Sequence, residues 1–297
     1  MPWQIIVFSR VVTGHIFTPL LLKRLTGLNL SLKRLVWWQF LFCFIFSLIY
    51  ALVFGFSLKL QLLMVAGIGF FNSFGAYCHW QAIKISLSKT SLFTQTDDII
   101  GMSLGYWLLN ETKYLNTGLI FGIILCLGAA SLLISGESNI RLIKYVAIYS
   151  IIWGIATFLE RYFAITGISF SEFLVGWYGG TLVGISCILF FLKEEGLAIK
   201  VPKKEILSVG ILAIAIWLSM FLGYWAAKLA PITVFQPIFM VSEAVLPTLI
   251  GLMVFKEIKS LRVKTFIFHD RNYTFPLEKF AFLLGFAGII AISASYN

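Results

Sequence analysis

Ten apolar stretches of about 20 residues each, joined by mostly short polar connections, fill most of this 297-residue sequence. A helix that crosses a bilayer needs about 20 apolar residues. Only 12% of the residues are charged, against about 25% in soluble domains. The sequence therefore predicts an all-α integral membrane protein with about ten transmembrane helices. We expect these helices near residues 3–22, 35–55, 61–83, 91–110, 115–135, 143–163, 172–192, 206–227, 233–254 and 279–296.

The fourth apolar stretch carries two adjacent carboxylates near its middle, Asp97 and Asp98. A carboxylate at the centre of a membrane helix costs roughly 2.5–3.5 kcal/mol on insertion scales, so such residues have a partner or a function. The stretch has a counterpart 146 residues later, in which an acid stands at the same place. The equivalent pairs are Phe93 and Phe239, Asp97 and Glu243, Gly105 and Gly251, and Glu111 and Glu257.

This internal repeat divides the chain into two halves, residues 1–138 and 139–297, each with five expected helices. Because five is an odd number, the two copies must enter the membrane in opposite directions. Inverted repeats of this kind are typical of secondary transporters, in which the repeats surround one central site. We therefore expect two inverted five-helix repeats that form one compact transmembrane unit.

Several short features accompany the repeat. Trp153–Gly154 opens the second half, and each acid is followed fourteen residues later by a glutamate, in Asn110–Glu111 and in Lys256–Glu257. Gly128 and Gly288 stand in the last expected helix of each half. Together with the repeated architecture, these features resemble the drug/metabolite transporter superfamily, and within it the ten-helix EamA-type transporters.

The resemblance covers essentially the whole chain, with departures at three positions. The first half has Thr13–Gly14 where Trp–Gly is typical of the family. Asp98 and Ala244 stand where proline usually follows the acid in this family. The resemblance implies a proton-coupled exporter of small metabolites such as amino acids. It also implies an integral protein of a plasma membrane, such as the bacterial inner membrane.

Asp97 and Glu243 are the candidate groups for binding protons and substrate. Asp97 shares one helix face with Gly101 and Gly105, because these residues are four positions apart along the chain. A carboxyl group in a membrane cavity can exchange its proton for a cationic or zwitterionic substrate. A protonated acid that only hydrogen-bonds another helix is the alternative that stays open. For the adjacent Asp98, we favour a helix–helix hydrogen bond.

Histidine and aromatic side chains complete the candidate substrate site. His15 in the first expected helix and His79 in the third could bind a proton or the substrate. A core histidine with satisfied hydrogen bonds is the simpler interpretation of each. An aromatic wall around an organic substrate could be formed by Trp37, Trp153, Trp177, Tyr224 and Trp225. Aromatic side chains near helix ends, such as Trp37 and Trp177, also anchor proteins at the membrane interface.

Other polar and small residues have structural interpretations. Close helix packing accounts for Gly101, Gly105 and Gly251. Glu160–Arg161 falls near the end of an expected helix, so we expect it to contact lipid headgroups. Glu111 and its counterpart end their helices, where a negative charge opposes the helix dipole. We therefore expect each of them to pair with a Lys or Arg.

No catalytic motif is present, because the sequence lacks H-E-x-x-H, G-x-S-x-G and Walker A patterns. We expect neither an enzyme nor a bound metal or cofactor, and any driving energy would come from an ion or substrate gradient. The net charge of +10 fits contact with anionic lipids and does not indicate nucleic-acid binding. A homo-oligomer stays open. So do two other functions, a carrier of lipid-linked or nucleotide-sugar cargo and a membrane scaffold or sensor that transports nothing.

Basic residues are distributed unevenly between the connections. Of the 23 Lys and Arg residues, 18 fall in odd-numbered connections, which include a basic insertion at 256–278, and four fall in even-numbered ones; the remaining residue is Arg10. The positive-inside rule then places the odd-numbered connections in the cytoplasm and both termini outside. The family resemblance implies the opposite orientation, and we favour the charge distribution.

Overall fold

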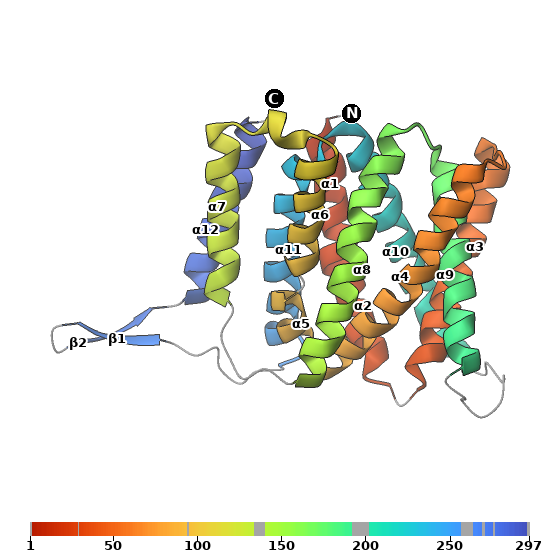
Figure 1. Ribbon diagram of the computed structural model, residues 1–297. Helices are drawn as coiled ribbons and strands as arrows, with labels where there is room; N and C mark the ends of the chain where they lie inside the picture. Colours follow the sequence, from red (N-terminus) through yellow and green to blue (C-terminus); the bar gives the residue numbers. More distant parts are fainter. Residues whose placement is uncertain are drawn as a thin grey trace.

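A bundle of long helices, with axes that run roughly in one direction, forms the body of the protein (Figure 1). The computed structural model describes residues 2–28, 30–93, 95–133, 140–191, 202–256, 264–268, 271–275 and 277–295. The helical elements are α1 (Trp3–Val11), η1 (Val12–Phe17), α2 (Thr18–Thr26), α3 (Leu32–Phe54), α4 (Leu60–Ile85), α5 (Leu87–Phe93), α6 (Gln95–Leu108), η2 (Glu111–Tyr114), α7 (Thr117–Leu133), α8 (Ile140–Ile165), α9 (Phe170–Phe191), α10 (Lys203–Leu229), α11 (Ile232–Met253) and α12 (Leu277–Ser295). The strands are β1 (Lys264–Phe268) and β2 (Arg271–Phe275).

Seven helices in the described part of the chain are long and apolar enough to cross a membrane. They span Trp3–Thr26, Leu32–Phe54, Leu60–Ile85, Ile140–Ile165, Phe170–Phe191, Lys203–Leu229 and Ile232–Gly251. The three other ranges expected from the sequence coincide with α5 and α6, with α7 and with α12. A helical protein with membrane-spanning segments is thus the architecture that the apolar stretches predict.

One element differs from the all-α expectation. Within the basic insertion, β1 and β2 pair as an antiparallel hairpin in which Lys264 lies opposite Phe275. The hairpin projects from the side of the bundle (Figure 1). Its two segments alternate aromatic and threonine or isoleucine side chains, which favour strands over helices.

Local signals in the sequence set several helix ends. At the start of α9, Ser169 N donates to Glu172 Oε2 at 3.0 Å, and Glu172 N donates to Ser169 Oγ at 3.2 Å. This reciprocal pair is a capping box, which satisfies two of the free amides at a helix N-terminus. At the end of α3, Gly55 adopts a φ of 89°, a conformation that glycine adopts without strain.

Glycines on α9 allow it to pack closely against α4. Gly176, Gly180 and Gly184 recur every four residues and therefore lie on one face. A Cβ atom on Gly180 would overlap the carbonyl oxygen of Ala66 on α4, and one on Gly184 would lie 2.6 Å from the carbonyl oxygen of Phe70. Small residues at such crossings are the usual means by which membrane helices approach each other.

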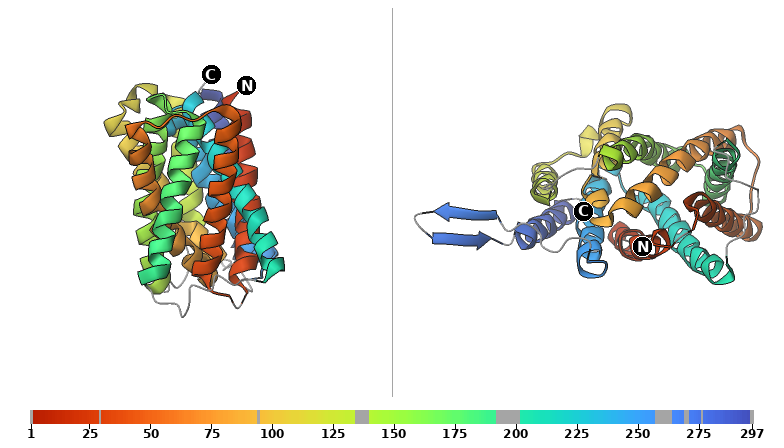
Figure 2. Two further views of the ribbon diagram at one scale, coloured as in Figure 1. Left: turned by 90° about the vertical axis from the view of Figure 1, so that its right-hand side faces the viewer. Right: turned by 90° about the horizontal axis from the view of Figure 1, so that it is seen from below.

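The helices α7 and α12 form a separate pair at one edge of the bundle (Figures 1 and 2). They cross at Gly122 and Gly288, where a Cβ on either residue would lie within 3 Å of the other's carbonyl oxygen. The remaining helices surround the centre of the molecule. The helices α7 and α12, which correspond to the fifth and tenth expected helices, therefore lie outside the part of the bundle that holds the cavity described below.

The two ends of the bundle differ in the connections they carry. Both termini lie at one end, which we call the terminal end (Figure 1). The C-terminal ends of α2, α4, α7, α9 and α11 lie at the other end together with the hairpin. We call this the basic end, because it receives the odd-numbered connections that hold most of the Lys and Arg residues.

Candidate functional site

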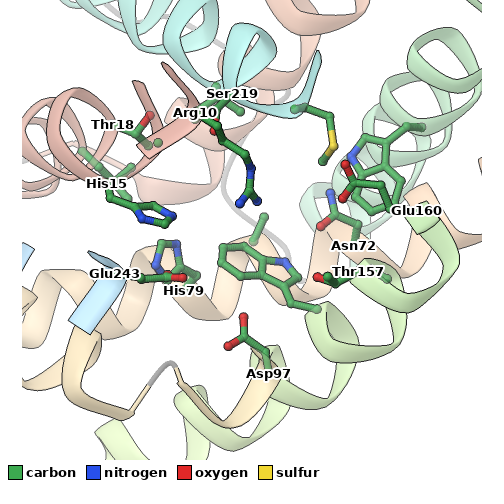
Figure 3. Close-up of a pocket in the computed structure, with 18 of the residues that line it drawn as sticks. Arg10, His15, Thr18, Asn72, His79, Asp97, Thr157, Glu160, Ser219 and Glu243 are labelled. Carbon is green, nitrogen blue, oxygen red and sulfur yellow. The ribbon is translucent and has the colours of Figure 1, made fainter. Parts of the chain in front are cut away.

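A cavity of about 200 Å³ lies inside the bundle and receives residues from both halves of the chain. Its lining residues come from α1, α2, α3, α4, α6, α8, α9, α10 and α11 and from the π-helical turn η1, and Figure 3 shows most of them. The lining residues that carry or can carry a charge are Arg10, His15, His79, Asp97, Asp98, Glu160 and Glu243. The cavity thus holds four carboxyl groups and one guanidinium group inside an apolar bundle.

The first membrane-spanning segment is irregular where it meets the cavity. Val12–Phe17 forms a π-helical turn, and the hydroxyl of Thr18 donates to the carbonyl oxygen of Thr13 at 2.9 Å. Turns of this kind are rare and frequently occur at functional sites. Here the turn brings Gly14 and His15 to the cavity wall.

Asp97 and Asp98 reach the cavity from α6, and both are nine-tenths or more buried. Asp97 Oδ1 accepts a hydrogen bond from the amide of Asp98 at 3.0 Å. Asp98 Oδ1 accepts one from the side-chain amide of Gln236 on α11. The helix–helix hydrogen bond expected for Asp98 is therefore confirmed. Its second oxygen, Oδ2, is buried without a hydrogen-bond partner among the described residues.

Glu243 lies on α11 and lines the cavity together with Asp97, as expected from their equivalent places in the repeat. The backbone of α11 is also polar at this position, because of a proline one turn further on. Pro247 has no amide hydrogen, so the carbonyl oxygen of Glu243 lacks its helical hydrogen-bond donor. Both the side chain and the backbone of Glu243 are therefore able to interact with polar groups.

Arg10 is the guanidinium group of the cavity, and it comes from α1. Its guanidinium carbon lies 3.9 Å from the centre of the Phe239 ring, a cation–π arrangement. Its Nε and Nη1 atoms are buried without hydrogen-bond partners in the described part of the chain. A buried donor without a partner is costly, so these atoms are suited to a bound polar group.

Glu160 lies on α8 close to Arg10. A Cβ atom on Gly223 would come within 2.8 Å of Arg10 Nε and within 2.9 Å of Glu160 Oε1. Oε1 of Glu160 is also buried without a partner among the described residues. The sequence predicts headgroup contact for Glu160–Arg161, and this expectation is wrong, because the two side chains are only 8% and 9% exposed and lie inside the bundle.

The two histidines of the site have different surroundings. His15 Nδ1 and Ser242 Oγ form a hydrogen bond of 2.7 Å, as expected for a buried core histidine. His15 also lines the cavity. His79 packs against the rings of Trp153 and Tyr149, at centroid distances of 4.6 and 5.1 Å. Figure 3 draws His15, His79 and Glu243 on the same side of the cavity.

Of the five aromatic residues expected around the substrate, Trp153 and Trp177 line the cavity. The Nε1 atom of Trp153 is buried without a partner among the described residues. Tyr224 does not line the cavity, because its ring stacks on Phe173 at 4.0 Å and its hydroxyl donates to the carbonyl oxygen of Ile168 at 2.9 Å. Tyr224 is therefore a packing residue rather than a wall of the site.

The cavity also contains residues for which the sequence predicts no role in a substrate site. Arg10, Glu160 and Gln236 provide unpartnered polar atoms in addition to those of Asp98 and Trp153, and Tyr178 belongs to the aromatic lining. Arg10 carries a signal in the sequence, because it is the one arginine inside the first apolar stretch. Charged residues inside membrane helices are functional candidates on that ground alone.

Among the expected packing glycines, Gly101 and Gly105 make close contacts. A Cβ on Gly101 would lie 3.3 Å from the carbonyl oxygen of Gly154 on α8, and one on Gly105 would overlap the side chain of Ile232 on α11. Gly251 is buried in α11. The glycines next to Asp97 thus hold α6 against two helices that also carry acids of the cavity.

Glu111 has the basic partner that the sequence predicts. Arg161 Nε donates to Glu111 Oε1 at 3.0 Å, which confirms the expected ion pair. The counterpart Glu257 lies outside the described residues, as does Thr94 next to Asp97. Glu111 is not a lining residue of the cavity, so it stabilises the terminal end of the bundle instead.

Comparison with known proteins finds no matching protein family and no matching curated relative. A solved structure described only as "Crystal structure of protein" is similar to this chain with a TM-score of 0.72 at 15% identity. The similarity covers 99% of this chain and 97% of that one. At this identity the similarity concerns the fold alone, and it extends over the whole helical architecture.

Proposed function

We propose that this chain is a secondary transporter that exchanges small polar metabolites, such as amino acids, for protons across a plasma membrane such as the bacterial inner membrane. The observation that carries the proposal is the cluster of carboxyl groups around the cavity. Asp97, Asp98, Glu160 and Glu243 line a space of about 200 Å³ inside an apolar bundle. Such buried acids mark ion and substrate pathways in membrane proteins.

The charge balance of the cavity favours proton or cation exchange. Four carboxyl groups face one guanidinium group, which leaves three acids without a fixed countercharge among the described lining residues, leaving the histidines aside. Each ionised acid in a membrane costs roughly 2.5–3.5 kcal/mol on insertion scales. These acids must therefore carry protons or meet a cationic group of a substrate, and alternation between the two states is proton-coupled exchange.

The arrangement of the helices supports two inverted repeats around one site. Asp97 of the first half and Glu243 of the second both line the cavity. The helices that carry its polar groups include a π-helical turn and the proline-containing α11. Irregular helices at a central site are typical of transporters built from inverted repeats. Membership of the EamA-type drug/metabolite transporters belongs to the same proposal.

The alternative cargo, a lipid-linked or nucleotide-sugar molecule, fits the cavity less well. Drug-sized molecules occupy pockets of roughly 300–1,000 Å³, whereas this cavity measures about 200 Å³. Arg10 alone would have to balance the phosphate groups against four acids. A scaffold or sensor without transport would have no need of a polar cavity, so we favour the transporter over both.

The proposal is tested by flux in proteoliposomes with an imposed pH gradient. A panel of labelled amino acids and other small amines is offered to the parent protein and to the Asp97→Asn and Glu243→Gln variants. We expect gradient-driven flux of at least one solute in the parent and its loss in one or both variants. Flux that survives both changes would make the acids structural.

A matched control is available outside the cavity. Glu172 is an acid at the start of α9 that does not line the cavity, and Glu172→Gln retains a side chain that can close the capping box. We expect its flux to stay at the parent level. If no solute moves in the parent, transport itself is contradicted and the scaffold interpretation gains support.

A further inference from the structure

Two oppositely charged side chains of the central cavity stand close to each other without touching. Arg10 reaches the cavity from α1 and Glu160 from α8. The position of a Cβ atom on Gly223 would lie 2.8 Å from Arg10 Nε and 2.9 Å from Glu160 Oε1, so these two atoms are at most about 6 Å apart. Because Gly223 has no Cβ atom, its own side chain does not occupy this position. We call the space between the two charged groups the Arg10–Glu160 gap.

Neither side of the Arg10–Glu160 gap has the partner that a buried charge requires. Arg10 Nε and Nη1 and Glu160 Oε1 are buried without hydrogen-bond partners among the described residues. The guanidinium packs instead on the ring of Phe239, 3.9 Å from its centre. Buried charged groups are costly unless they are hydrogen-bonded. The gap is therefore suited to a ligand that supplies an acceptor to Arg10 and a donor to Glu160.

The two opposite charges restrict the ligand to one that carries both signs. A simple amine would pair with Glu160 but meet the positive charge of Arg10, and a simple anion would pair with Arg10 but meet the negative charge of Glu160. Such like-charge contacts are strongly unfavourable. In an α-amino acid, the carboxylate and the ammonium are attached to one carbon and lie about 3 Å apart. With charge-assisted hydrogen bonds of about 2.7–2.9 Å on each side, this head group can bridge the gap.

The walls next to the Arg10–Glu160 gap are mostly apolar. The cavity volume of about 200 Å³ can hold a molecule of about ten non-hydrogen atoms, since one water molecule needs roughly 10–15 Å³ of such space. Positions three or four residues apart share a helix face, and the other lining residues of α8 and α10 follow this spacing from the two sides of the gap. They are Trp153, Ala156, Thr157, Ile216, Ser219 and Met220. Four of these six residues are apolar, so they favour an apolar group beyond the head group.

We infer that the Arg10–Glu160 gap binds the head group of an α-amino acid with an apolar side chain. Arg10 binds the carboxylate, Glu160 binds the ammonium, and the apolar walls receive the side chain. The inference rests on the proposed function, because it names the substrate class and the residues that hold it. Since α1 belongs to the first half of the chain and α8 to the second, the bound head group connects the two halves. Transporters with inverted repeats hold their substrates at such an interface.

This assignment leaves other acids of the cavity available for protons. In the view of Figure 3, Glu160 and Glu243 lie on opposite sides of the Arg10 guanidinium. A zwitterion adds no net charge to the cavity, so Asp97 and Glu243 are not needed to balance it. Glu160 thus meets the substrate, whereas Asp97 and Glu243 hold the coupled protons.

The test measures binding without transport, as the thermal stabilisation of the purified full-length protein in detergent by a ligand. Leucine, methionine and phenylalanine are each compared with their methyl ester, which lacks the carboxylate, and with their N-acetyl derivative, which lacks the ammonium. We expect at least one of the free amino acids to stabilise the parent protein. Both of its derivatives should bind about tenfold more weakly, because each loses hydrogen bonds to a charged group.

Two variants should each lose one of these preferences and keep the other. Arg10→Gln should bind the free amino acid and its methyl ester equally, and Glu160→Gln should bind the free amino acid and its N-acetyl derivative equally. Arg10→Lys should retain the preference for the free carboxylate, because it retains the positive charge. Glu172→Gln, outside the cavity, should retain both preferences. A general disturbance of the fold would not produce these two opposite patterns.

The ligand comparison in the parent protein decides the inference even if Arg10→Gln does not fold. Equal binding of a free amino acid and its methyl ester would overturn the site, and so would the absence of binding by all three amino acids. Arg10 and Glu160 would then serve only as charges that balance each other. Binding with the expected pattern but without flux would contradict transport and support the site. Gradient-driven flux of simple amines alone would support transport and overturn the site.

Discussion

Glu111 and Arg161 form a buried ion pair at the terminal end, in which Arg161 Nε donates to Glu111 Oε1 at 3.0 Å. Oε2 of Glu111 accepts hydrogen bonds from the amide and the hydroxyl of Thr233, each at 3.1 Å. Thr233 is the second residue of α11, so the carboxylate also caps this helix at its positive end. Arg161 donates a further hydrogen bond to the carbonyl oxygen of Ala227 on α10. One ion pair thus connects η2, α8, α10 and α11.

Removal of Arg161 should strongly destabilise the protein. The Arg161→Ala variant leaves the carboxylate of Glu111 buried without its countercharge, and breaking a buried pair costs about 3–5 kcal/mol. Arg161→Lys should also be destabilised, because one ammonium group cannot reproduce both directed hydrogen bonds of the guanidinium. The measurement is the free energy of unfolding in detergent. An Arg161→Ala variant as stable as the parent would show that the pair contributes nothing.

The hydrogen bond between Gln236 and Asp98 should be detectable in the same assay. Gln236→Leu removes the donor to a buried carboxyl group and should cost about 1–3 kcal/mol, the usual penalty for a buried polar group left unpaired. Asp98→Asn should have a smaller effect, because its side-chain oxygen can still accept from Gln236. Equal losses in the two variants would indicate that the carboxyl group itself, and not its bond to α11, stabilises the bundle.

The glycine face of α9 gives a third prediction. In Gly180→Ala the new methyl group would overlap the Ala66 carbonyl oxygen, so α9 and α4 must separate. Overpacking of this kind costs about 1–3 kcal/mol. The matched control is Gly67→Ala on α4, where a Cβ atom meets nothing within 4 Å. This control should be as stable as the parent or more so, since alanine is the better helix former.

Much of the helical arrangement follows from local properties of the sequence. Length and apolar content decide whether a stretch can span a membrane, and neither depends on the fold. The repeat predicts a shared role for Asp97 and Glu243 for the same reason, because an acid at equivalent positions can be recognised without any contact information. The structure places both at one cavity.

The faces of the helices are harder to predict, and the errors lie there. The sequence predicts a substrate wall for Tyr224 and contact with lipid headgroups for Arg161, yet both side chains lie in packed parts of the bundle. Their helices are apolar on nearly all sides, so the sequence pattern cannot show which side faces the centre. The bond of Gln236 cannot be predicted from the sequence, because its partner Asp98 is 138 residues away.

The distribution of charge predicts the orientation in the membrane. Of the 23 basic residues, 18 belong to the connections assigned to the basic end, so that end should face the cytoplasm and both termini should lie outside.

Cysteine labelling in intact cells tests this orientation, with the four native cysteines replaced beforehand. Lys113→Cys probes η2 at the terminal end, and Lys84→Cys probes the basic end; both positions are exposed. A membrane-impermeant maleimide should label only Lys113→Cys, because the bilayer shields the other site. Each variant removes one charge from its own end, which leaves the bias in place. Labelling of Lys84→Cys alone would reverse the orientation.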